Sequence, residues 1–442
     1  MMKSSIPIIA LSAALVMALP ARAKTLEQTV AETLDSNPQV RLEYNQFKAR
    51  EEQVNQARSD YMPQIDLYGR YGYRQSDTPT GRSRNGDHDL ETTPTEAGVS
   101  ISQLIFDGFG TTANVDRLSK EAAANQWALF SRAEDTALEV TRVYLGVIKA
   151  QQLLELAEHN LANHQSIHDK ILQRSQSGLG SSADLAQSSG RLARAQSNRI
   201  AAVNNLLDAQ TQFRTVTNMD AEELILPMPD HDLLPEDRIS AIASADNHPL
   251  LRSAELDIAA AHAERKSARG DYYPELSLRL DGGWGDDLGD YEGHNNDLAA
   301  TLELKYNLFA GGATRARSRE AAYKIGSAKS IQERAYRDVI EGMRLSWNAY
   351  EQLGVQKTYL RQHVEASKEA QLAYSEQFRL GQRTLLDLLD TENELFRARE
   401  DFVRAEMDEL LAKYRILNAS GRLLDSLRVT RPSEWAAERD YE

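Results

Sequence analysis

Four short segments of the chain alternate between apolar and polar residues with the period of a β-strand. They are residues 65–74, 98–106, 276–284 and 301–308. Segments of about ten residues with one apolar face and one polar or charged face are typical of transmembrane β-barrels. A surface sheet of a soluble protein would explain one such segment, but four of them, paired within a repeat, favour a barrel.

Aromatic and turn-forming residues mark the ends of these strands. Tyr71, Tyr73 and Trp284 suit the aromatic girdle at a membrane interface. The links at residues 75–94 and 285–296 are rich in Gly, Asp and Asn, so we expect them to be extracellular loops. Four strands cannot close a barrel, and lipid does not satisfy an open sheet edge, so several copies must contribute to one barrel.

Two long stretches without proline predict unusually long helices. Proline is absent from residues 95–226 and 275–431, and both stretches are rich in strong helix formers. Long helices are expected at residues 110–177 and 312–380, with returning helices that end near residues 218 and 418. At ~1.5 Å per residue each long helix would extend ~100 Å, far more than a compact domain needs.

An apolar stripe with coiled-coil spacing runs along residues 143–171, and a matching stripe runs along residues 389–417. Such a stripe faces neighbouring helices, which belong either to the same chain or to several chains. His164 and His168 lie on the first stripe, with His159 nearby, but no acid accompanies them in an arrangement such as His-Glu-x-x-His. We therefore expect packed or hydrogen-bonded histidines rather than a metal site.

A glycine-containing turn is expected at the far end of each long helix. The turns comprise Gly178, Leu179, Gly180 and Ser181 in the first case, and Leu380, Gly381, Gln382 and Thr384 in the second. Glycine supplies the C-terminal cap of the long helix, and Ser181 or Thr384 starts the returning helix. An aspartate follows three residues later, as Asp184 or Asp387.

The chain has the pattern of a tandem duplication. Asn37-Pro38 matches His248-Pro249, and the two turns match at a similar spacing. The expected division is repeat one at about 37–218, a linker at 219–246, repeat two at about 247–420 and a tail at 421–442. The sequence leaves open whether the tail packs around the middle of the helices or lacks a fixed structure.

The N-terminus and the composition narrow the class of protein. Residues 1–23 are expected to be a signal peptide that ends at Ala21-Arg22-Ala23, so the mature chain would comprise residues 24–442. No later segment is apolar over about 18 residues, so we expect no transmembrane helix. The absence of cysteine excludes disulfides and thiolate sites, and the net charge of −15 argues against nucleic-acid binding. No arrangement of residues indicates catalysis or a cofactor.

With these features in place, the chain resembles the TolC family of outer-membrane channel proteins over nearly all of its mature length. The segment from Phe378 to Leu395, FRLGQRTLLDLLDTENEL, is similar to the second tip of type I secretion channels, in particular LapE/AggA-like members that export large adhesins. The resemblance implies an α+β membrane protein that forms a homotrimer, with a twelve-stranded barrel continuous with a tunnel of twelve helices. It also implies a Gram-negative outer membrane, with the helices in the periplasm.

The resemblance also implies a gate and partners. The family's two gate aspartates fall on Asp387 and Asp390, and its latch arginine falls on Arg383. The latch's threonine and tyrosine are replaced here by Ala183 and Phe378, while Asp184 remains as a partner for Arg383. The two turns would dock a periplasmic membrane-fusion adaptor. The alternative for Asp387 and Asp390 is that acids simply favour the start of a helix.

The resemblance therefore implies a passive conduit, not an enzyme, that exports a protein by type I secretion. The energy would come from an inner-membrane ABC transporter. Drug or solute efflux with a proton-driven pump is the runner-up. The absence of cysteine weighs mildly against efflux, because many pump-associated members carry a lipid on an N-terminal cysteine. A soluble periplasmic adaptor is a third possibility, against which the four strands argue.

Overall fold

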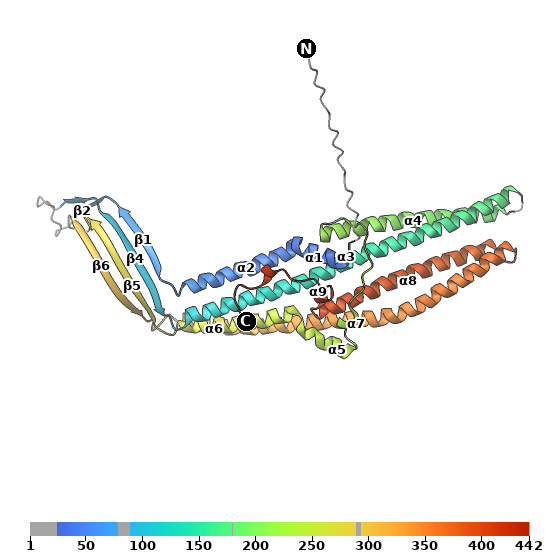
Figure 1. Ribbon diagram of the computed structural model, residues 1–442. Coiled ribbons are helices and arrows are strands. Elements are labelled where there is room, and N and C mark those ends of the chain that lie inside the picture. Colours follow the sequence, from blue (N-terminus) through green and yellow to red (C-terminus); the bar gives the residue numbers. More distant parts are fainter. Residues whose placement is uncertain (1–23, 78–88, 179, 289–292, 442) are drawn as a thin grey trace, which may run out of the picture.

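The computed structural model describes residues 24–77, 89–178, 180–288 and 293–441. A curved sheet lies at one end of the elongated chain, and long helices run from it to two turns at the other end (Figure 1). The expected signal peptide at residues 1–23, Leu179 and parts of the two links between strands, at residues 78–88 and 289–292, lie outside the described residues.

Four antiparallel strands form the sheet in the order β1, β4, β5, β6. Their bounds are Gln64–Tyr71 for β1, Thr95–Phe106 for β4, Glu275–Asp286 for β5 and His294–Lys305 for β6. A separate ribbon pairs β2 (Arg74–Asp77) with β3 (Asp89–Thr92). All four predicted strands are present, and β1 and β6 are the two edges of the sheet.

Two sequence predictions at this end need correction. The fourth strand was predicted at residues 301–308 but occupies His294–Lys305, because backbone pairing with β5 holds its first residues. Those residues are His, Asn, Asn and Asp, which are weak strand formers and conceal the strand in the sequence. The first link, predicted as a loop at residues 75–94, contains most of the β2–β3 ribbon.

The sheet separates an apolar face from a polar face. Ile65 pairs with Ile101, which in turn pairs with Leu280, so apolar side chains lie side by side across three strands. Ile65 is 68% exposed, so the chain itself does not cover this face there. On the other face Arg70 lies 3.4 Å from Glu96.

The helices occur in two sets of matching length. The bounds are Pro38–Ser59 for α2 and Pro249–Gly270 for α6, Gly110–Gln176 for α3 and Ala313–Arg379 for α7, and Ser182–Thr217 for α4 and Leu385–Ala419 for α8. Both α3 and α7 contain 67 residues. Shorter helices are α1 (Leu26–Ser36), α5 (Arg238–Ser244) and α9 (Leu423–Ser426). The predicted long helices and their returning partners are confirmed.

The matching dipeptides start the matching helices. The side chain of Asn37 accepts a hydrogen bond from the Gln39 backbone nitrogen at 2.9 Å, and Nδ1 of His248 accepts one from Leu250 at 3.2 Å. Each cap residue precedes a proline at the first helical position, where proline loses no hydrogen bond. The two sequence pairs thus perform the same local task.

A dense core lies about halfway along the helices, and we call it the middle region. It joins α1, α2, α3, α4, α8 and α9 around the fully buried side chains of Tyr144 and Phe213, whose ring centroids lie 6.4 Å apart. The Tyr144 hydroxyl lies 2.8 Å from the Lys24 carbonyl oxygen and accepts a hydrogen bond from the Ile225 nitrogen at 3.0 Å.

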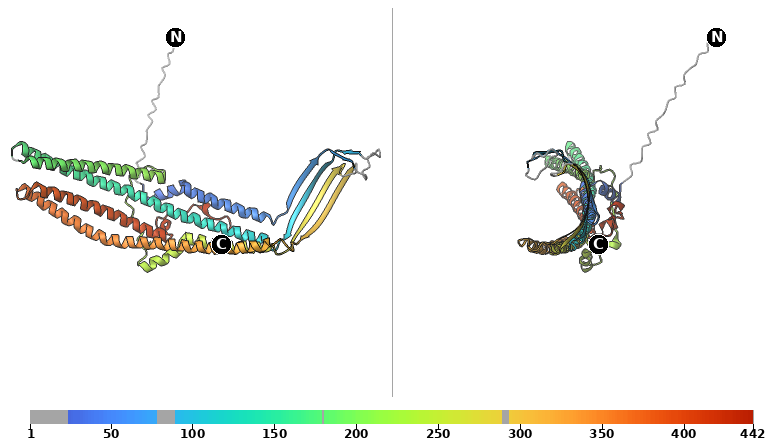
Figure 2. Two further views of the ribbon diagram at one scale, coloured as in Figure 1. Left: turned by 180° about the vertical axis from the view of Figure 1, so that it is seen from behind. Right: turned by 90° about the vertical axis from the view of Figure 1, so that its left-hand side faces the viewer.

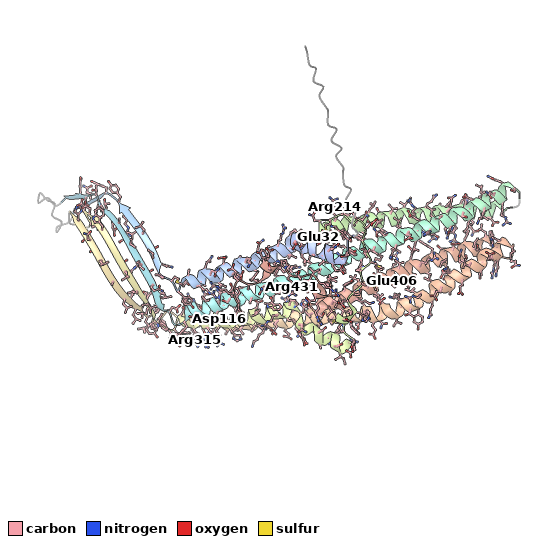
Figure 3. All side chains as sticks on the ribbon, in the orientation of Figure 1. Glu32, Asp116, Arg214, Arg315, Glu406 and Arg431 are labelled. Atoms are coloured by element: carbon pink, nitrogen blue, oxygen red, sulfur yellow. The ribbon has the colours of Figure 1, made fainter. Side chains whose placement is uncertain are left out.

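The C-terminal tail packs on the middle region and on the helices beside it, which answers the question that the sequence left open. Gln126 donates to the Trp435 carbonyl oxygen at 2.9 Å, and Lys120 donates to the Tyr441 carbonyl oxygen at 3.1 Å. The Trp435 side chain is itself buried in the core. Figure 3 labels Arg431, which lies in this tail against the long helices.

A buried acid secures the start of the tail. Glu134 on α3 is 0% exposed, and its Oε2 accepts hydrogen bonds from the backbone nitrogens of Leu423 at 2.9 Å and Leu424 at 3.3 Å. Arg431 lies 3.8 Å from its other oxygen. Burial dominates over these partners and raises the pKa of Glu134 to about 7.

None of the helices within the described ranges is long and apolar enough to cross a membrane.

The histidines on and near the apolar stripe were predicted to be packed or hydrogen-bonded, and this holds for two of the three. His164 is 5% exposed, and His168 Nδ1 lies 3.1 Å from the Ser188 hydroxyl, whereas the side chain of His159 is largely exposed and lies 3.8 Å from Glu155.

Candidate gate at the tips of the long helices

The far end of the molecule consists of two helical hairpins, α3–α4 and α7–α8, whose turns lie next to each other (Figure 2). Gly178 and Gly381 end the long helices with φ of +72° and +75°, a left-handed conformation that favours glycine. Both therefore act as the C-terminal caps that the sequence predicts. Leu179 lies outside the described residues, and Leu380 is 72% exposed.

The returning helices start in different ways. Ser181 accepts a single hydrogen bond, from the Ala183 nitrogen at 3.1 Å. Thr384 forms a full capping box with Asp387: its hydroxyl accepts from the Asp387 nitrogen at 3.2 Å, and its own nitrogen donates to the Asp387 carboxylate at 3.2 Å. The predicted aspartate three residues on is thus a capping partner only in the second hairpin.

Asp387 is held mainly by this cap. Its carboxylate also accepts a hydrogen bond from the Thr384 hydroxyl at 2.8 Å. The hydrogen bonds from Thr384, with a smaller contribution from the charge of Arg383, hold the pKa of Asp387 below its usual range. The group is therefore ionised at neutral pH, and the helix-start explanation accounts for its position in the chain.

Asp390 has a different environment. It lies one turn further along α8, does not belong to the cap, and accepts a hydrogen bond from Nη2 of Arg191 on α4 at 2.7 Å. The contact joins the second hairpin to the first. Asp390 was singled out from the sequence, but Arg191 was not, although it follows Asp184 by two helical turns and so lies on the same face of α4.

Arg383 contacts its own hairpin. Its Nε donates to the Gln377 side chain at 3.0 Å, and its guanidinium lies 4.3 Å from the centroid of the Tyr374 ring. Within the described part of one chain, Arg383 and Asp184 form no ion pair, and the half-buried Asp184 lies in the first turn of α4. A pairing between neighbouring copies remains a prediction.

A small apolar cluster packs the two hairpins together. Its buried members are Ile167 and Ile171 of α3 and Leu385, Leu388 and Leu389 of α8. Beside this cluster the side chain of Asn163 donates to the buried carboxylate of Glu392 at 3.2 Å. This polar contact was not predicted from the sequence, because Asn163 lies on a different helix from the tip segment that contains Glu392.

The aromatic residues at the other end of the molecule lie near the links between the strands. Tyr71 is the last residue of β1, and Tyr73 lies between β1 and β2. Their exposed fractions are 81% and 65%, and that of Trp284 in β5 is 44%. This exposure is compatible with an aromatic girdle, which remains a prediction.

The sheet with its exposed apolar residues, continued by long paired helices, defines the class as an outer-membrane channel protein. The model of the family described as "Outer membrane efflux protein" matches residues 29–219 and 243–422, and the chain belongs to this family. It is a family of channel proteins rather than of enzymes. The chain is accordingly a protein of the Gram-negative outer membrane with periplasmic helices.

Individual relatives agree with this assignment. The chain is 26% identical to outer membrane efflux protein BepC of Brucella suis over 95% of this chain and 90% of the relative. It is 26% identical to TolC of Escherichia coli over 91% and 83%, and 21% identical to alkaline protease secretion protein AprF of Pseudomonas aeruginosa over 88% and 83%. The solved structure of the Campylobacter jejuni outer membrane channel CmeC has the same fold, with a TM-score of 0.80, 14% identity, and coverage of 90% and 86%.

Proposed function

We propose that the chain is the exit channel of a tripartite export system that carries a large protein, such as a surface adhesin, by type I secretion. The observation that carries the proposal is the direct continuation of an apolar-faced sheet into two 67-residue helices, which makes a conduit rather than a site for chemistry. The segment from Phe378 to Leu395, with its likeness to adhesin-exporting members, and the secretion relative AprF support protein cargo.

Three copies would complete the channel. One copy supplies four strands and ends in the unpaired edges β1 and β6, so three copies give a twelve-stranded barrel. Viewed along its length, one copy forms an arc (Figure 2). Apolar side chains on the outer helices support contact between copies, because Ile200 on α4 is 66% exposed and Tyr359 on α7 is 67% exposed.

In this assembly the two turns would dock a periplasmic membrane-fusion adaptor, which links the channel to an inner-membrane ABC transporter. Tyr71, Tyr73 and Trp284 would lie at the membrane interface. The mature channel would comprise residues 24–442, with the two repeats and the tail as the sequence divides them.

Asp387 and Asp390 would form rings of carboxylates at the periplasmic entrance, with Arg383 and Asp184 as a latch between neighbouring copies. Clustered carboxylates attract cations and resist close approach unless other charges compensate them. Replacing Arg383 by alanine is expected to raise the conductance of single channels in a lipid bilayer. An unchanged conductance would contradict the latch.

The test of the cargo is the amount of large adhesin on the surface of cells that lack the gene, compared with a complemented strain. Loss of adhesin from the surface, restored by complementation, is expected. An unchanged surface level would remove adhesin export from first place.

Drug or solute efflux with a proton-driven pump is the second candidate, favoured by the 26% identity to the efflux protein BepC. The same deletion strain separates the two functions. Greater sensitivity to toxic compounds with normal surface adhesin would favour efflux.

A further inference from the structure

The gate aspartates of the second hairpin do not have equal freedom within one chain. Asp387 is engaged by the cap of its own helix, whereas Asp390 is 56% exposed in its side chain and contacts Arg191 of the first hairpin. The two acids are therefore held by different parts of the molecule.

Arg191 is the anchored partner of the pair. Its side chain is only 26% exposed, about half the exposure of Asp390, so the arginine has less freedom to leave the contact. His164 of α3, which is 5% exposed, lies within the electrostatic influence of this guanidinium. Burial, aided by the charge of Arg191, lowers the pKa of His164, so this neighbour is neutral and adds no positive charge beside the guanidinium.

The contact between Arg191 and Asp390 also joins two helices, α4 and α8, that otherwise have few contacts with each other. The apolar cluster and the Asn163–Glu392 hydrogen bond connect α8 to α3, whereas Arg191 connects α8 to α4. In the second repeat the position equivalent to Arg191 is Glu394, which lies 2.9 Å from His363 of its own hairpin. The two equivalent positions thus carry opposite charges, and only Arg191 contacts the other hairpin.

We propose that Arg191 is a positioning residue of the gate, which holds Asp390 against the first hairpin of its own protomer and compensates its charge. In the proposed trimer this would neutralise three of the carboxylates at the entrance and tie each second hairpin to its first. The inference rests on the proposed channel function and deepens it. Arg191 then limits how strongly the closed entrance attracts cations.

The test is single-channel recording of the purified full-length protein in planar lipid bilayers. Arg191→Ala is expected to raise conductance and to shift the reversal potential in a salt gradient toward greater cation selectivity. An exposed ion pair shifts the equilibrium between its formed and broken states by at most about five-fold. We therefore expect the conductance to change by roughly two-fold. Arg191→Lys keeps the positive charge and should remain near wild type.

A double-mutant cycle isolates the pair. In an Asp390→Asn background, Arg191→Ala is expected to have little further effect, because the carboxylate that it compensates is gone. Arg199→Ala is the matched control, since Arg199 also lies on α4 but pairs at 3.2 Å with Glu158 within the first hairpin. This control should leave selectivity unchanged.

The outcomes separate the inference from the proposed function. If the wild-type protein forms no channel, both the channel function and the role of Arg191 are overturned. If it conducts, and Arg191→Ala matches wild type or acts equally in the Asp390→Asn background, only the role of Arg191 is overturned.

Discussion

The middle region and the tip region of the chain are held together in different ways. In the middle, helices α1, α2, α3, α4 and α8 share one core around Tyr144 and Phe213 with the C-terminal tail, which contains α9. Buried polar groups such as Glu134 accept backbone hydrogen bonds there. At the tips, the two hairpins meet through the five-residue cluster of α3 and α8 and a few polar contacts. The middle region is thus stabilised by contacts among many elements, whereas the two hairpins at the tips contact each other mainly along α3 and α8.

The returning helices show the same contrast in one chain. Helix α8 buries residues along its whole length, from Leu385 to Ala419. Helix α4 buries only Ser188, Ala195, Phe213 and Thr217. Within one chain α4 is therefore held by little buried surface, which agrees with the contacts between copies that the proposed trimer would supply. Helix α8, which carries Asp387 and Asp390, is held by its own chain.

The largest effect should come from removing one buried side chain in each region. Phe213→Ala is expected to destabilise the protein by about 3–5 kcal/mol and Leu389→Ala by about 2–5 kcal/mol, since both side chains are fully buried. Amide hydrogen exchange should quicken across the middle region for Phe213→Ala, but only near the turns for Leu389→Ala. Leu386→Ala, at a position 46% exposed, is the control and should change little. If hydrogen exchange quickened over the same residues in both variants, the two regions would unfold as one unit.

A second difference between the regions is their response to pH. The pKa of Glu134 is raised to about 7 in the folded chain from an ordinary value of 4.5, so the folded state holds a proton that the unfolded state has lost. Stability should therefore fall as pH rises through this window, by on the order of 3 kcal/mol in total. Asp387 has the opposite effect on the pH dependence of stability. Its pKa is lowered in the folded chain, so the stability that it contributes is lost only as the pH falls into the acid range.

Glu134→Gln tests this directly. The variant cannot titrate at residue 134, so its difference in unfolding temperature from wild type should change between about pH 5 and about pH 8. Other titrating groups cancel in that difference. A difference that stays constant over the range would show that Glu134 does not carry the pH dependence.

The sequence was sufficient for the features that depend on local pattern. Proline-free stretches located α3 and α7, and positive-φ glycines fell where Gly178 and Gly381 were expected. The start of β6 was not predicted, because its polar residues have a low strand propensity and are held in the strand by pairing with β5. The tail was undecided because its position depends on Glu134, Gln126 and Lys120, which lie far away in the sequence.

The candidate site shows the same limit. Thr384 and Asp387 form the capping box that their spacing indicates, since a cap is a local structure. Arg191 was missed because its partner Asp390 lies on another helix in the other repeat, and one sequence does not reveal such a contact. Asn163 and Glu392 were missed for the same reason.

The smallest expected effect concerns the two turns themselves, which differ in how they start the returning helix. Thr384→Ala removes the capping box and should destabilise the start of α8 by about 1 kcal/mol, whereas Ser181→Ala removes one hydrogen bond and should cost α4 about half as much. Hydrogen exchange in the first turn of each helix measures both. The pKa of Asp387 lies below its usual range, so its carboxylate is ionised at neutral pH. The loss of stability in Thr384→Ala should therefore be full at neutral pH and should shrink in acid, where the carboxylate is protonated. The loss in Ser181→Ala should not depend on pH. Equal costs at both turns, or a loss at Ser181 that follows pH, would mean that the capping box does not distinguish the gate hairpin from its counterpart.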